Sequence, residues 1–288
     1  MDYLLHQNMR VFGGGAPPRN NAYHNAFATL SNTLGPPANR IRVAGFTEIV
    51  NYATAGAAAV SLAAVMGLNT SYNVACGRTA LAAGPEYISI ASALPVLSVG
   101  RIFMNASGQG MALAHDISPA QPPTAAWCQT VPQQATPDYR GVVYLVTMLM
   151  GTPIAVGFLH NLYTFQDQRA LVAGQIPHFV YLMASNPAID FGGPVYLGGD
   201  FNLSPFNRNS RNYGAYTAYS AGLAGVLPPG INPGGTTAAG NLYDYWYASI
   251  APATVPPVGF LTPAPQVWGH TLFHPNMSDH CATLLRTT

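Results

Sequence analysis

Short apolar runs punctuated by turn residues recur along this chain and predict β-strands, which alternate with helices early in the chain and with other strands late in it. Runs rich in Val, Ile, Leu, Tyr and Phe, bounded by Gly, Pro, Asn or Asp, are typical of strands. The runs that fit this pattern are residues 2–10, 41–46, 87–90, 96–104, 139–149, 153–159, 195–197 and 243–249, with a last strand expected to start at His280. Residues 87–90 and 96–104 are expected to pair with each other.

Helices are predicted at three places between these strands. Residues 21–34 show helical spacing, and residues 165–184 are expected to form a helix that returns the chain to the strand at 195. Residues 53–68 are apolar on all sides, which predicts a buried helix. The apolar stretches are too short or too interrupted to span a bilayer. Without an internal repeat or a long linker, residues 1–288 are expected to form a single domain.

The charge of the chain limits how it can hold a polyanion. Charged residues make up 7% of the sequence, against about 25% in typical soluble proteins, and all eleven basic residues are arginine. The formal net charge is +1. Because no strong long-range field would attract nucleic acid, any grip on phosphates must come from a local group of arginines.

The cysteines and the first residues say little about chemistry. Cys76, Cys128 and Cys281 lack the spacing of a metal site. Cys281 is expected to be a buried thiol, whereas Cys76 and Cys128 either pair in an exported protein or stay reduced. Residues 1–12 lack the charged start, apolar middle and cleavage site of a signal peptide.

Residues 195–205, VYLGGDFNLSP, carry the most informative motif. A short apolar strand runs into two glycines, which allow a tight turn and a close approach to a ligand. Asp200 and Asn202 follow, and side chains two apart on an extended chain point to the same side. Taken alone, the motif is equally consistent with an ordinary turn. It is accompanied, however, by Ser278-Asp279-His280 near the end of the chain and by Asn8 and Glu48 near its start.

Together, the GGDFN and SDH motifs and their order along the chain resemble the endonuclease/exonuclease/phosphatase superfamily of metal-dependent phosphodiesterases. The resemblance runs from Asn8 to His280 and so covers nearly the whole sequence. It implies an α/β fold: a four-layer α/β sandwich in which two mixed β-sheets pack face to face with helices outside. It also implies that strand ends gather the motif residues at one rim.

The resemblance implies a site for a divalent cation. Glu48 would be the carboxylate ligand with Asn8 beside it, and Asp279 would lie near the metal. Mg²⁺ is the expected ion, with Mn²⁺ or Ca²⁺ as alternatives, because hard cations prefer carboxylate and amide oxygens. The residue before the metal glutamate is Thr47 here, where the family usually has glutamine.

The resemblance also implies the catalytic residues. Asp200 and Asn202 would orient the attacking water and hold the phosphate. His280 would contact a phosphate oxygen, with Asp244 fixing its tautomer and favouring the charged ring. His160, which follows an apolar strand, matches the second histidine of the family.

Two further positions, Glu86 and Arg140, narrow the resemblance to the pancreatic deoxyribonuclease branch. Glu86 would pair with His160, and Arg140 would hold the phosphate, while Arg10 is expected near the site because it follows Asn8. The residues with which that branch reads the DNA minor groove are missing, since Val50 and Gly84 stand in their places. Bacterial cytolethal distending toxin nucleases share the active-site frame with a weaker need for groove contacts.

The sequence therefore favours a divalent-metal-dependent phosphodiesterase, with a nuclease of the deoxyribonuclease or toxin-subunit type first. The substrate would be nucleic acid, with DNA favoured, and partner subunits are expected if the chain is a toxin component. A secreted or exported bacterial protein is favoured over a cytoplasmic one. The alternatives are a phosphatase or phospholipase of the same superfamily, acting on phosphoinositide or sphingomyelin, and a catalytically idle binding module.

Overall fold

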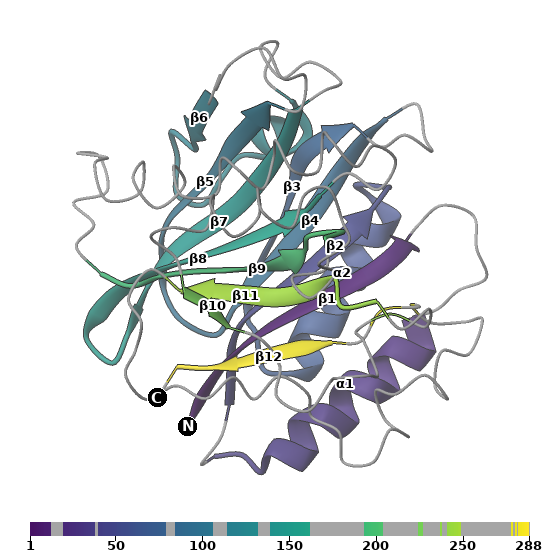
Figure 1. Ribbon diagram of the computed structural model, residues 1–288, viewed down its shortest axis with the longest axis vertical. Coiled ribbons are helices and arrows are strands. Elements are labelled where there is room, and N and C mark those ends of the chain that lie inside the picture. Colours follow the sequence, from purple (N-terminus) through teal and green to yellow (C-terminus); the bar gives the residue numbers. More distant parts are fainter. Residues whose placement is uncertain are drawn as a thin grey trace.

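The computed structural model of the 288-residue chain describes residues 1–12, 20–37, 40–78, 84–105, 114–131, 139–161, 193–203, 224–226, 237, 241–248, 278, 280 and 282–287. These residues form a mixed β-sheet with few helices (Figure 1). Among the helices in these ranges, none has the length and apolar character that crossing a membrane requires. The helix predicted over 165–184 lies outside the described residues, so a four-layer arrangement remains a prediction.

Most of the predicted strands are present, extended by a few residues at their ends. The strands are β1 (Asp2–Phe12), β2 (Arg40–Ile49), β3 (Thr70–Arg78), β4 (Pro85–Ser92), β5 (Val96–Asn105), β6 (Ala114–Ile117), β7 (Tyr139–Leu149), β8 (Thr152–His160), β9 (Val195–Asp200), β10 (Ala224–Val226), β11 (Asp244–Ala248) and β12 (Thr283–Arg286). The helices are α1 (Asn20–Leu34), α2 (Thr54–Val65) and the short α3 (Ala125–Gln129).

All these strands belong to one sheet that divides into two halves. One half has the order β12-β1-β2-β4-β3, and the other has the order β7-β8-β9-β11-β10, with β5 paired to β7 and β6 paired to β5. The halves join where Gly77 of β3 pairs with Arg140 of β7. The pairs β1–β2 and β8–β9 are parallel, whereas the other pairs are antiparallel.

The two halves face each other across a shared apolar core. Val43 of β2 and Ile88 of β4 belong to the same buried cluster as Val156 and Phe158 of β8. Gly45 of β2 permits this close packing, because a Cβ atom there would overlap the Phe158 ring. The strand ends of both halves can therefore contribute side chains to one site.

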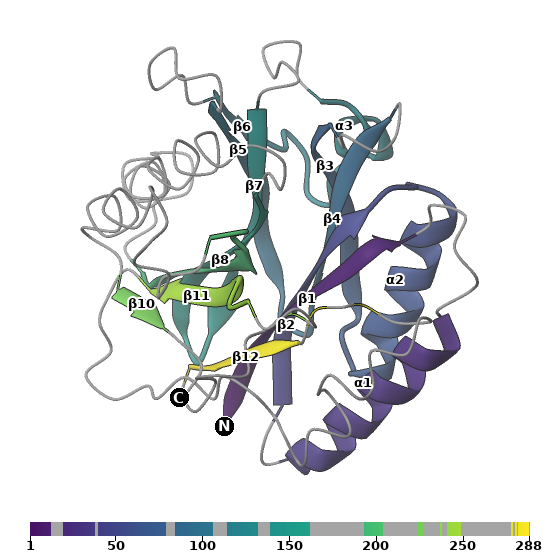
Figure 2. The same cartoon turned by 45° about the vertical axis from the view of Figure 1, so that its right-hand side comes forward.

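Helices α1 and α2 cover the outer face of the half that contains β1 and β2 (Figure 2). In α1, apolar residues at helical spacing are buried, and Phe27 packs against Phe46 of β2. The buried helix predicted over 53–68 is present as α2, but only one side of it is buried. In α2, Leu62 is buried but Val60 is 48% exposed, since a helix of small alanines costs little to leave half in water.

Two predictions about strands are wrong. Strand β4 pairs with β2 and β3, and β5 pairs with β6 and β7, so residues 87–90 and 96–104 do not pair with each other. The link between them carries the chain from one half of the sheet to the other, and Leu94 packs against the core on the way. The last strand begins at Thr283, while His280 forms only an isolated bridge with Thr237.

Candidate active site

Three neighbouring strand ends place acidic and basic side chains in one row. His160, at the end of β8, pairs in register with Asp200, at the end of β9. Asp200 in turn pairs with Asp244, at the start of the antiparallel strand β11. His160 and Asp200 end their strands and Asp244 begins the antiparallel strand β11, so the register brings all three to the same edge of the sheet. The row therefore forms part of the rim that the motif spacing predicts.

Asp200 lies at the centre of the site and is almost fully buried. Its Oδ2 atom accepts a hydrogen bond from the amide of Asn8 at 2.9 Å. The same oxygen lies 3.8 Å from Nε2 of His160 and 3.7 Å from Nε2 of His280. Burial, with the nearby charge of Asp244, raises the pKa of Asp200 against the opposing pull of the histidines. The Oδ2 atom of Asp200 therefore lies close to two imidazole rings.

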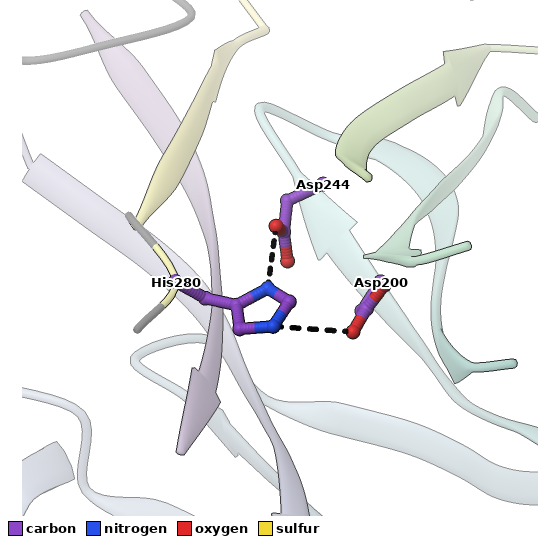
Figure 3. Close-up of side chains that lie close together, drawn as sticks. All are labelled: Asp200, Asp244 and His280. Atoms are coloured by element: carbon purple, nitrogen blue, oxygen red, sulfur yellow. Dashed lines mark hydrogen bonds and ion pairs between the residues drawn. The ribbon is translucent and has the colours of Figure 1, made fainter. Parts of the chain in front are cut away.

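His280 forms a hydrogen-bonded pair with Asp244 (Figure 3). Its Nδ1 atom donates to Oδ2 of Asp244 at 2.8 Å, which leaves Nε2 facing Asp200. The backbone of His280 lies outside a strand and is held by side chains: its N–H donates to Ser278 Oγ, and its carbonyl accepts from Gln7 Nε2. These contacts fix the ring although no regular element carries it.

His160 forms a second such pair, with Glu86. Nδ1 of His160 lies 2.5 Å from Oε1 of Glu86, and Nη1 of Arg140 donates to Oε2 at 3.0 Å. Burial raises the pKa of Glu86, but the charges of His160 and Arg140 outweigh it and lower the pKa to about 2. Burial lowers the pKa of His160, and the carboxylates of Glu86 and Glu48 reverse this and raise it to about 9. His160 is therefore charged at neutral pH.

Glu48 completes the site from the other half of the sheet. It lies within β2, where the pairing register shifts between Phe46 and Ile49, and not beyond the strand as predicted. Its φ of 59° falls in the left-handed region, as do those of Arg10 and Asn202. This backbone conformation is unfavourable for non-glycine residues, and residues that adopt it cluster at functional sites. The Glu48 Oε1 atom lies 3.6 Å from His160 Nε2.

Comparison with solved structures identifies the fold. Residues along 98% of this chain superpose on 70% of an endonuclease/exonuclease/phosphatase from Beutenbergia cavernae, with a TM-score of 0.62 and 13% identity. The human Nocturnin catalytic domain, with a bound sulfate anion, matches over 98% of this chain and 92% of its own at a TM-score of 0.57 and 15% identity. This chain has the endonuclease/exonuclease/phosphatase fold.

A third neighbour with this fold is a mannosyl-6-phosphatase from Bacteroides thetaiotaomicron, which matches over 99% of both chains at a TM-score of 0.57 and 12% identity. By sequence, no family model and no curated protein matches the chain. At these identities the likeness to solved structures shows the fold, and the narrower resemblance to deoxyribonucleases and toxin subunits stays a prediction.

Asn202 lies in the site of this endonuclease/exonuclease/phosphatase fold, yet its amide is used locally. Its backbone N–H donates to Asp200 Oδ1 at 2.9 Å, and its Nδ2 donates to the carbonyl of Asn161 at 2.9 Å. Asn161 returns a hydrogen bond from its own amide to the carbonyl of Phe201. These hydrogen bonds between the ends of β8 and β9 hold Asp200 in place. The contact of Asn202 with phosphate stays a prediction.

The donor set fits a hard divalent cation. The pKa of Glu48 is raised by burial and by the negative charges of Glu86 and Asp200, against the pull of His160. A cation beside Glu48 would relieve this repulsion, and carboxylate oxygens are ligands that Mg²⁺ prefers. Asn8 lies in the same site, although its Oδ1 accepts a hydrogen bond from the backbone of Arg10. Asp279 lies outside the described residues.

A second cluster within the described part of the chain also meets the spacing of a metal site. Ligand atoms of Asp200, Asp244 and His280 lie within 4.8 Å of one another. In this geometry, however, Nδ1 of His280 already donates to Asp244. We therefore interpret Asp244 and His280 first as a hydrogen-bonded pair that faces Asp200, and Glu48 as the better metal ligand.

Sequence reasoning missed His6, Gln7 and Asn161, all of them buried close to the motif residues. His6 and Gln7 lie inside an apolar strand, where polar residues are easily taken for strand surface. Their position beside Asn8 was the available signal. Arg10, by contrast, is exposed at the end of β1.

The two described cysteines are reduced. Cys76 and Cys128 are both buried and free, and the thiol of Cys76 donates to the carbonyl of Glu86. Burial raises the pKa of both thiols. Neither cysteine therefore acts as an activated nucleophile in this structure. Cys281 lies outside the described residues.

Proposed function

We propose that this protein is a divalent-metal-dependent phosphodiesterase that acts as a nuclease, with DNA as the favoured substrate. One observation carries the proposal: Oδ2 of Asp200 lies 3.8 Å and 3.7 Å from Nε2 of two histidines, each held at Nδ1 by its own carboxylate. A hydrolase needs a base for water next to donors for the phosphoryl oxygens, and this arrangement supplies both.

The residues divide the chemistry of hydrolysis between them. Asp200, with its raised pKa, is suited to accept a proton from the attacking water. The water oxygen forms a bond to phosphorus, the bond to the leaving oxygen breaks, and that oxygen takes a proton. His160, charged at neutral pH, can donate that proton or a charge-assisted hydrogen bond to a phosphoryl oxygen. His280 presents its Nε2 to the same region.

A cation would be held by Glu48 with Asn8, and Asp279 is expected nearby. When bound, Mg²⁺ would supply positive charge to the phosphoryl oxygens and to the leaving oxygen. The chain's own contribution is to keep Glu48 on a strained turn of β2 that faces His160. Mn²⁺ and Ca²⁺ offer the same class of oxygen chemistry and are alternatives.

Arg140 is suited to hold a phosphate. Its side chain is buried, one nitrogen is bonded to Glu86, and its Nε has no hydrogen-bond partner among the described residues. A buried guanidinium donor without an acceptor is costly, and a phosphoryl oxygen would be a matching acceptor. Arg10, exposed beside Asn8, could add a second contact.

The alternative is a phosphatase or phospholipase that acts on phosphoinositide or sphingomyelin. The low charge favours it, because a net charge of +1 with eleven arginines and no lysine gives little attraction to a long polyanion. The mannosyl-6-phosphatase shows that this fold also serves small phosphate esters. The toxin-subunit role, in turn, rests on the sequence resemblance and is part of the nuclease proposal.

The test is a side-by-side assay of plasmid nicking, phosphoinositide phosphate release and sphingomyelin cleavage with Mg²⁺. We expect nicking that stops with excess chelator and in the Glu48→Gln variant. The matched control is Asp2→Asn, the same chemical change at the far end of β1, where Asp2 pairs with Arg42. Activity that survives chelation would overturn the metal mechanism, and phosphate release without nicking would favour the alternative.

A further inference from the structure

His6 lies on β1 between the apolar core and the active site. Leu4, His6 and Asn8 alternate onto one face of the strand: Leu4 belongs to the core between the halves, and Asn8 bonds to Asp200. His6 is completely buried, and its ring stacks on Phe158 with centroids 6.4 Å apart. Neither the sequence motifs nor the proposed chemistry gives this histidine a task.

The ring of His6 connects two parts of the site. Its Nε2 atom is 3.2 Å from Oγ1 of Thr47, the residue before Glu48. Its Nδ1 atom faces Oδ1 of Asp244 at 3.7 Å, while the other oxygen of Asp244 binds His280. Nδ1 is buried and has no hydrogen-bond partner among the described residues. Asp244 thus lies between two imidazole rings.

The chemistry of the neighbours determines the tautomer of His6. The ring of His6 is completely buried, so the partners of its two nitrogens decide where its N–H lies. A carboxylate only accepts hydrogen bonds, whereas the hydroxyl of Thr47 can donate. The arrangement that satisfies both neighbours has Nδ1–H directed at Asp244 and Nε2 accepting from Thr47. Contacts of this length in an unliganded site commonly tighten when substrate binds.

We propose that His6 is a positioning residue. Its Nδ1–H orients the carboxylate of Asp244, so that the other oxygen of Asp244 holds His280 with Nε2 directed at Asp200. The catalytic part of this inference rests on the proposed function. The geometric part stands on the contacts of His6 with Asp244 and Thr47. A second donor on Asp244 would restrict rotation of the carboxylate.

The first experiment removes both nitrogens of the ring. His6→Phe keeps a planar ring against Phe158, and we expect kcat for plasmid DNA with Mg²⁺ to fall by about tenfold. KM should change by less than about twofold, because the loss concerns the transition state. His115→Phe, which removes a half-buried imidazole that contacts Tyr144 away from the site, is the matched control.

Two conservative variants separate the contacts of the ring. The amide nitrogen of Asn at position 6 takes the place of Nδ1, and that of Gln takes the place of Nε2. His6→Asn should therefore recover most of the lost kcat, and His6→Gln should not. Equal losses in both variants, in proportion to their fall in Tm, would mean that His6 only fills space and would overturn the proposal.

Nitrogen NMR of the wild-type protein gives a readout independent of activity and of variant folding. We expect His6 to show a protonated Nδ1 and an unprotonated Nε2. The His280 Nδ1 proton should shift in His6→Phe and not in His115→Phe. A protonated Nε2 on His6 would overturn the inference even in an active enzyme. The expected spectrum from a chain that cleaves no nucleic acid would support the positioning of Asp244 and remove only the nuclease proposal.

Discussion

Two imidazole–carboxylate pairs approach the same oxygen of Asp200, and they differ in what lies behind them. Glu86 holds His160 and is itself bonded to the guanidinium of Arg140. Asp244 holds His280, and its other oxygen faces the neutral ring of His6. The first pair is therefore backed by a positive charge and the second by a neutral donor.

Two imidazole–carboxylate pairs of similar geometry can therefore differ in the charge of the groups around them. In the first pair, the surplus of carboxylates around His160 raises its pKa to about 9, while Arg140 keeps Glu86 ionised. In the second pair, the burial that lowers the pKa of His6 keeps positive charge away from Asp244. The first histidine is suited to donate, and the second depends on the orientation of its carboxylate.

The largest loss of activity is expected for a substitution of Asp200, which both pairs approach. Asp200→Asn would remove the base and one of the two oxygens that accept hydrogen bonds from Asn8 and Asn202, while keeping a side chain of similar shape. We expect kcat to fall by about 10⁴ with the fold retained. Single-turnover cleavage with circular dichroism on the same sample would check this. A loss below about tenfold would remove Asp200 from the proposed chemistry.

The next effect tests whether the second pair acts as a unit. Asp244→Asn should lower kcat by about 10³, close to the loss in His280→Ala, because His280 would lose the acceptor that fixes its tautomer. The double variant should then be no worse than the worse single variant. Losses that multiply in the double variant would show that Asp244 and His280 act separately.

The residues that face outward from strand ends could be predicted from sequence. His160 and Asp200 lie where an apolar strand ends and Asp244 where one begins, and the pairing register brings them into one row. Their neighbours across the sheet were harder to predict, because His6 and Gln7 stand within an apolar strand. The alternation of polar and apolar residues along a strand indicates which face of the sheet a side chain occupies. It does not indicate which side chain lies opposite.

Most strands could be predicted, although β3, β6 and β10 were missed, and the partners of the strands were predicted less well. Local pattern located β4 and β5 but could not show that Leu94 carries the chain between the halves of the sheet. Glu48 was expected beyond its strand, and the bulge that turns it toward His160 has no sequence signal other than the motif itself. Pairing across the sheet depends on long-range packing, which a local pattern does not record.

The pH dependence of kcat/KM should distinguish the two pairs, through a smaller effect on activity. Glu86→Gln removes the negative charge nearest to His160, so the pKa of His160 should fall from about 9. If the charged ring is needed, the alkaline decline of kcat/KM should begin at lower pH in this variant, with about a tenfold loss at pH 8. Asp244→Asn should leave the position of that decline unchanged. Superimposable profiles for Glu86→Gln and wild type would show that the charge on His160 is not required.

The last effect concerns stability and not activity, and the two pairs should respond on opposite sides of neutral pH. The folded pKa of His160 is raised from 6.5 to about 9, so its contribution is complete below pH 6.5 and lost as the pH rises through 9. The folded pKa of His6 is lowered from 6.5 to about 3, so unfolding takes up a proton between these values and stability falls as the pH drops.

Urea unfolding from pH 4 to pH 9 in wild type, Glu86→Gln and His6→Asn would separate these contributions. Each group adds a slope of up to about 1.4 kcal/mol per pH unit within its window. Glu86→Gln should flatten the decline above pH 6.5, because it removes the carboxylate that favours the charged His160. His6→Asn should flatten the decline below pH 6.5, because it removes the group that protonates on unfolding. If both variants changed the same side of the profile, the two pairs would not have the separate electrostatic settings that their neighbours indicate.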